Sequence, residues 1–125
     1  MKRILLVTDD FAMTDELTFF LQHSGFQVMS TNEGHHALAE LHRGFPDLIV
    51  IHQTNHKLNG DDLCIRMREL SDVPIIVLGQ DQEEASGVVM LEMGADAYLT
   101  SPLNPRELLA RIRSLLRRTR ASQAT

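Results

Sequence analysis

The chain of 125 residues has the size of a single domain, and its hydrophobic content of 43% is that of a globular protein rather than a disordered one. No apolar run approaches the ~20 residues that cross a bilayer, and a net charge of −5 argues against nucleic-acid binding by the domain itself. The single Cys64 excludes an internal disulfide framework and fits a reducing compartment, so we expect a cytoplasmic domain that makes no membrane contact.

Apolar runs alternate with helical patterns along the chain. Residues 4–7, 48–51 and 75–78 are short and almost uninterrupted, as in strands buried on both faces of a parallel sheet. Residues 26–29 and 97–99 are weaker and suit edge strands. Apolar residues at helical spacing follow each of the five runs. Five β-α units in strict alternation predict an α/β fold with a doubly wound parallel sheet.

Glycines and charges mark the ends of the expected elements. Gly25, Gly44 and Gly94 each follow a helical pattern and are read as helix stops. Six of the 12 Lys and Arg residues lie after residue 105. We interpret them as the solvated face of a last helix, with a nucleic-acid arm as the weaker alternative. We expect one domain over residues 1–120, with residues 121–125 beginning a linker or disordered tail.

Polar residues follow the central strands. Thr8, Asp9 and Asp10 come after the first strand, His52 after the third, Gly79 after the fourth and Ser101 after the fifth. Ligands of such sheets bind outside the carboxyl ends of the strands. These residues are therefore predicted to converge on one pocket.

Several motifs in order carry a family resemblance over about residues 2–119. They are RILLVTDD at 3–10, PDLIVI at 46–51, NG at 59–60, PIIVL at 74–78, GADAYL at 94–99 and PRELLARI at 105–112. The chain resembles a response-regulator receiver domain, and its tail is similar to the winged-helix (OmpR/PhoB) subfamily of transcription factors. The resemblance implies a flavodoxin-like (βα)5 fold with strand order 2-1-3-4-5.

The chain departs from this family at the positions that carry its chemistry. The resemblance places the family's acidic pair at Thr8 and Asp9, with Asp10 following. It places the phosphoaccepting Asp at His52, the hydroxyl residue at Gly79 and the Lys at Ser101. Imidazole cannot form an acyl phosphate, and magnesium prefers hard oxygen ligands. We therefore predict no aspartyl phosphorylation, no enzymatic activity and no cofactor.

His52 leaves several interpretations open. The favoured one is an inward hydrogen bond, including one to Asp9 or Asp10 that raises the pKa of the imidazole. A metal site with Asp9, Asp10 and His56 is a weaker alternative, and a phosphohistidine weaker still. His35 and His36 are adjacent, cannot share one helical face and are read as solvated.

The resemblance also implies a dimer face formed by the fourth helix, fifth strand and fifth helix. Asp96, Glu107 and Arg111 match its salt-bridge pattern, whereas Gly87 and Ala97 replace other partners. Val89, Met90 and Met93 form either an apolar patch on this face or part of the core. Tyr98 matches the family's aromatic switch, and Gly79 beside it leaves permanent space for an inward ring.

The sequence thus predicts an atypical receiver domain of a two-component transcription regulator, acting by phosphorylation-independent interaction or dimerisation. Its expected partners are a second copy or another signalling protein, with DNA bound only through a possible downstream winged-helix domain. The alternatives are a metal- or small-molecule-sensing pocket at the vacated site and a conventional phospho-aspartate switch, which is disfavoured.

Overall fold

Strands and helices alternate in the computed structural model, which describes residues 1–53, 60–80 and 84–124. The elements are β1 (Arg3–Val7), α1 (Phe11–His23), β2 (Gln27–Thr31), α2 (Gly34–His42), β3 (Leu48–His52), α3 (Gly60–Leu70), β4 (Ile75–Gly79), α4 (Glu84–Glu92), β5 (Ala97–Thr100) and α5 (Pro105–Ala124).

The strands of the described chain form one parallel sheet in the order β2-β1-β3-β4-β5, which confirms the predicted fold. Every residue of β3 and β4 is buried, as their uninterrupted apolar sequences predict. The edge strand β2 begins at Gln27, one residue after Phe26. Phe26 instead packs under the end of α1, where its N–H donates to Leu21 O at 3.1 Å.

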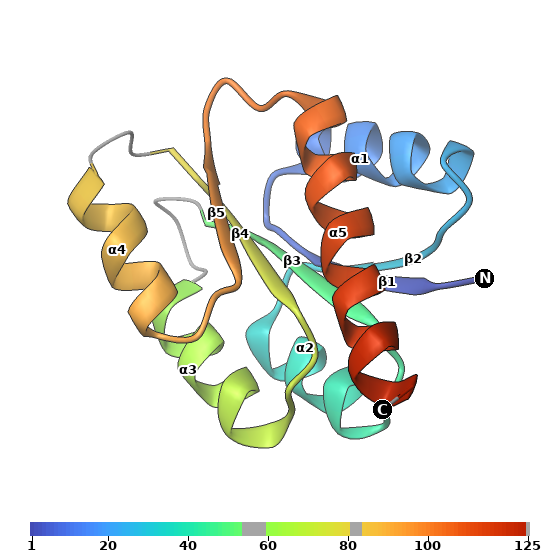
Figure 1. Cartoon of the computed structure of the whole chain (residues 1–125). Helices are drawn as coiled ribbons and strands as arrows, with labels where there is room; N and C mark the ends of the chain where they lie inside the picture. Colours follow the sequence, from blue (N-terminus) through green and yellow to red (C-terminus); the bar gives the residue numbers. More distant parts are fainter. Residues whose placement is uncertain (54–59, 81–83, 125) are drawn as a thin grey trace.

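Helices cover both faces of the sheet (Figure 1). The core on the α1 and α5 side includes Leu17, Leu21, Leu108 and Ile112. The core under α2, α3 and α4 contains side chains from all three helices and from the central strands, among them Ala37, Leu63, Met67 and Met90. This two-sided burial leaves the carboxyl ends of the strands as the place where polar side chains gather.

Helix ends follow the sequence signals. Gly25, Gly44 and Gly94 have φ values of 96°, 79° and 120°, a left-handed conformation that glycine adopts without steric cost, so the three predicted stops are confirmed. Helix α5 runs to Ala124, beyond the expected domain boundary at residue 120, and that boundary stays a prediction. In the described part of the chain, no helix has both the length and the hydropathy of a membrane span.

Candidate functional site

His52 is the last residue of β3 and is almost fully buried, with 4% of its surface exposed. Its Nδ1 lies 2.9 Å from Oγ1 of Thr8, which follows β1 and is also buried. The neighbouring strands β1 and β3 bring these two side chains together. The predicted inward hydrogen bond of His52 is confirmed, and its partner is the Thr8 hydroxyl rather than a carboxylate.

Thr8 also fixes the start of the next helix. Its Oγ1 accepts a hydrogen bond from Asp10 N–H at 3.1 Å, and Asp10 Oδ1 accepts one from Met13 N–H at 3.1 Å. Asp10 is therefore the N-cap of α1. Since the hydroxyl accepts from Asp10, its own hydrogen is available to an unprotonated Nδ1 of His52, which fits a neutral ring.

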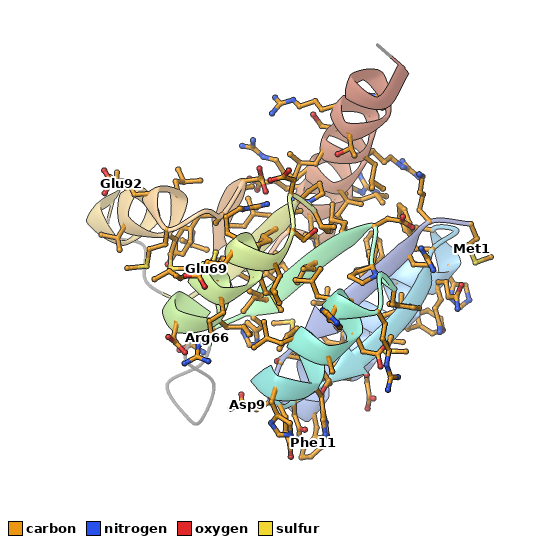
Figure 2. All side chains as sticks on the ribbon, turned by 90° about the horizontal axis from the view of Figure 1, so that it is seen from below. Met1, Asp9, Phe11, Arg66, Glu69 and Glu92 are labelled. Atoms are coloured by element: carbon orange, nitrogen blue, oxygen red, sulfur yellow. The ribbon has the colours of Figure 1, made fainter. Side chains whose placement is uncertain are left out.

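Asp9 is partly buried between Thr8 and the helix cap, at the edge of the sheet where Figure 2 labels it beside Phe11. Within the described residues, the side chains of Asp9, Asp10 and His52 do not form a group whose ligand atoms all lie within 4.8 Å of one another. His56, the fourth residue of the alternative metal site, lies outside the described residues. The weak metal assignment to Asp9 and Asp10 gains no support from this arrangement.

The predicted direction of the His52 pKa shift is wrong. Burial of the imidazole lowers its pKa below 6.5, while the negative charges of Asp10 and Asp9 act in the opposite direction without prevailing. The prediction weighed partial burial against two nearby carboxylates and expected the charge effect to prevail, whereas burial has the larger effect. In the structure His52 is enclosed by sheet residues, and Asp10 is turned toward the helix end.

The lowered pKa of His52 predicts how the stability of the fold depends on pH. Between the folded-state pKa and the unfolded value near 6.5, the unfolded chain binds more protons at His52 than the folded chain does. The free energy of unfolding should therefore fall as the pH drops through this window. We expect His52→Asn, which cannot titrate, to lose less stability than the parent between about pH 7.5 and 5.5 in urea denaturation. A parent that gains stability relative to the variant on acidification would contradict this direction.

Tyr98 occupies the space beside Gly79. A Cβ atom on Gly79 would lie 2.5 Å from Cζ and 2.8 Å from Cε1 of Tyr98, and one on Gly87 would lie 3.3 Å from its Cδ2. The ring thus lies between the end of β4 and helix α4, and it packs against the core under α2, α3 and α4. The inward space predicted from Gly79 is present and filled, and Gly87 contributes to it in a way that the sequence did not reveal.

Ser101 lies next to Gly79, since its N–H donates to Gly79 O at 3.1 Å. The peptide bond from Ser101 to Pro102 is cis. The carboxyl ends of neighbouring strands thus bring Thr8, His52, Gly79 and Ser101 to one edge of the sheet, while their convergence on one pocket stays a prediction. Thr8 and Ser101 supply hydroxyl groups and His52 supplies a buried imidazole. Gly79 supplies only backbone atoms, which the Tyr98 ring covers.

Residues 4–113 match the response regulator receiver domain family. The chain belongs to this family. It is 39% identical over 118 residues to the sensory transduction protein RegX3 of Mycolicibacterium smegmatis, covering 94% of this chain and 52% of that protein. It is 38% identical over 119 residues to the alkaline phosphatase synthesis transcriptional regulatory protein PhoP of Bacillus subtilis, covering 94% and 50%. The receiver domain thus spans about half the length of these curated relatives.

Solved receiver structures agree closely with the fold. A CheY-like receiver domain protein from Methanospirillum hungatei superposes with a TM-score of 0.89 at 28% identity, covering 98% of each chain. The BeF3-activated N-terminal receiver domain of Klebsiella pneumoniae RstA gives a TM-score of 0.86 at 28% identity, covering 93% of this chain and 99% of that one. The chain therefore has an ordinary receiver scaffold.

The residues assigned to the predicted dimer face differ from one another in burial and in the contacts that they make. Asp96 Oδ2 lies 2.8 Å from Arg68 Nη2 and also accepts from Ile75 N–H at 2.8 Å, so this carboxylate is engaged within the receiver domain. Glu107 and Arg111 are exposed on α5. On α4, Met90 is buried in the core and Met93 packs against it, whereas Val89 is exposed. The dimer face stays a prediction.

Arg68 is a structural residue that sequence analysis missed. Its guanidinium donates to Gly94 O at 2.7 and 3.1 Å, to Val73 O at 3.0 Å and to Ser71 O at 3.2 Å, besides the pair with Asp96. This side chain joins the end of α3 to the segments that enter β4 and β5. The only sequence signal was a basic residue in the last turn of a helix, which is a common feature.

Proposed function

We propose that this receiver domain regulates a partner without being phosphorylated on aspartate. The observation that carries the proposal is the buried His52, hydrogen-bonded to Thr8 at the position where the resemblance puts the phosphoaccepting carboxylate. A carboxylate oxygen must attack phosphorus to form an acyl phosphate, and an imidazole has no such oxygen. Thr8 supplies a hydroxyl in place of an acid, which weakens the site for magnesium.

The remaining groups support the same proposal. Ser101 stands where the resemblance puts a Lys, so this position offers no ammonium to balance charge on a transferring phosphoryl group. Gly79 has no hydroxyl to contact a phosphate, and the space of its missing side chain is filled by Tyr98. We infer that the ring is held inward by packing and does not respond to a modification at the strand ends.

As the regulatory domain of a longer protein, this receiver domain would act through protein contacts and would catalyse no reaction. The relatives are named as sensory transduction and transcriptional regulatory proteins of about twice this length. We infer that this receiver domain acts in the cytoplasm beside a DNA-binding domain and transmits its state by self-association or by binding another signalling protein. The predicted self-association would use Glu107 and Arg111 on α5.

The conventional phospho-aspartate switch is the alternative, favoured by the 39% identity to RegX3. Beryllofluoride with magnesium mimics the phosphoryl group of an acyl phosphate and separates the two functions. We expect its addition to leave the amide NMR spectrum of this receiver domain unchanged, because His52 offers no carboxylate to hold beryllium. The Klebsiella RstA receiver domain, which has a BeF3-activated structure, is the positive control. Saturable shifts at residues 8–10, 52 and 79 would establish the conventional switch instead.

A further inference from the structure

Two adjacent histidines and a glutamate converge at the start of α2. His35 Nε2 lies 2.9 Å from Glu33 Oε2, and His36 Nδ1 lies 3.5 Å from the same oxygen. The two imidazole rings are 4.3 Å apart between centroids. The side chains are exposed, as predicted, but their convergence on one carboxylate was not foreseen. Both rings reach back over the first turn to one carboxylate.

Helix capping does not explain this arrangement. Glu33 is the N-cap residue of α2, yet its side chain makes no capping hydrogen bond. The turn is held instead by Thr31, whose Oγ1 accepts from Glu33 N–H at 3.2 Å. The carboxylate of Glu33 is thereby left to face the two imidazoles. The first turn of α2 carries no acidic side chain, so these two histidines stand where a helix start usually favours acids.

We propose that Glu33, His35 and His36 bind a divalent transition-metal ion of the zinc type. These three side chains each offer one ligand atom, and the three atoms all lie within 4.8 Å of one another. Among the described residues, they form the group of His, Cys, Asp or Glu side chains that meets this condition. Imidazole nitrogen and carboxylate oxygen are ligands that zinc takes in proteins, and three protein ligands leave a fourth position open.

The spacing of the ligand atoms suits a tetrahedral ion. Metal–ligand bonds of about 2.0–2.1 Å at tetrahedral angles place ligand atoms roughly 3.3 Å apart. The separations of 2.9 and 3.5 Å from Glu33 Oε2 bracket this value, so small side-chain rotations suffice to admit the ion. The negative charge of Glu33 offsets the unfavourable effect of a helix N-terminus on a cation. Open exposure of all three side chains gives the ion a direct path from solvent.

Isothermal titration of the metal-free domain with zinc chloride tests the proposal, with the binding site mapped by amide NMR. We expect one zinc ion per chain and shifts confined to residues near 31–37. Glu33→Gln, His35→Ala and His36→Ala should each weaken binding at least about tenfold. The matched control is His42→Ala, which removes an exposed histidine from the last turn of the same helix and should leave the affinity unchanged.

Three results would overturn the zinc site. They are no binding at millimolar zinc, undiminished binding after His35→Ala and His36→Ala, and an equal loss of affinity in the His42→Ala control. Amide spectra of each variant show whether the fold is retained, so a folding defect is not mistaken for lost coordination. The outcome is independent of the phosphorylation proposal, because the zinc ligands belong to the start of α2 and do not include His52 or Thr8, and because the titration contains no phosphodonor.

Discussion

Replacing Gly79 with Ala should push the Tyr98 ring out of its inward position. The added Cβ would lie 2.5 Å from Tyr98 Cζ, which is too close for two carbon atoms that are not bonded to each other. Gly79 does not have a positive φ, so the backbone tolerates Ala, and the nearest atoms to the added Cβ all belong to Tyr98. Overpacking of this kind costs about 1–3 kcal/mol of unfolding free energy.

Tyr98 provides its own signal for this test, because the chain has one tyrosine and no tryptophan. We expect Gly79→Ala to lower the urea midpoint and to make the tyrosine fluorescence more accessible to acrylamide. Gly34→Ala is the matched control, since a Cβ there would meet Leu63 Cδ1 at an ordinary 3.5 Å. In a Tyr98→Leu background the cost of Gly79→Ala should shrink, as a double-mutant cycle would measure. Unchanged quenching and stability in Gly79→Ala would refute the inward, fixed ring.

Replacing Arg68 with Ala should be the most destabilising change outside the apolar core, by about 2–4 kcal/mol, because hydrogen bonds to charged groups contribute more than neutral ones. The substitution removes the donors that serve three backbone carbonyls and the carboxylate of Asp96. Arg68→Lys should recover only part of the loss, since an ammonium cannot span acceptors arranged around a planar guanidinium.

Arg66→Ala is the control for this substitution. Arg66 lies on the same helix and pairs with Asp62 at 2.9 Å, with both side chains exposed. An exposed pair of this kind contributes about 0.3–0.5 kcal/mol. Urea denaturation of the two variants should therefore separate them clearly. If Arg68→Ala is no more destabilising than Arg66→Ala, the guanidinium contacts do not hold these segments together.

The fold could be predicted because local signals agreed with one another. The buried runs 4–7, 48–51 and 75–78 became the three central strands, and the three glycine stops have the left-handed conformation that their role requires. The position of His52 at a strand end followed from the same pattern. Its hydrogen-bond partner did not, because a sequence shows that Thr8, Asp9 and Asp10 are nearby without showing which one turns inward.

The features that the sequence did not predict have a common physical origin. The pKa direction of His52 depends on the balance between burial and nearby charge, and burial is a property of the folded chain. The pair of Asp96 with Arg68 joins residues that are distant in sequence, so it could not be read from the sequence, and the assignment of Asp96 to a dimer face stays a prediction. The grouping of His35 and His36 on Glu33 depends on side-chain rotation at a helix start, which helical periodicity does not describe.

Intact-mass spectrometry after incubation with phosphoramidate and magnesium asks directly whether this receiver domain can be phosphorylated. We expect the mass of the pocket-containing peptides to stay unchanged under conditions that fully modify the RstA receiver domain. A gain of one phosphoryl group on Asp9, Asp10 or His52 would contradict it. Alkaline treatment, which hydrolyses an aspartyl phosphate but leaves a phosphohistidine intact, would then separate His52 from the two aspartates, and peptide mapping would identify the residue that carries the group.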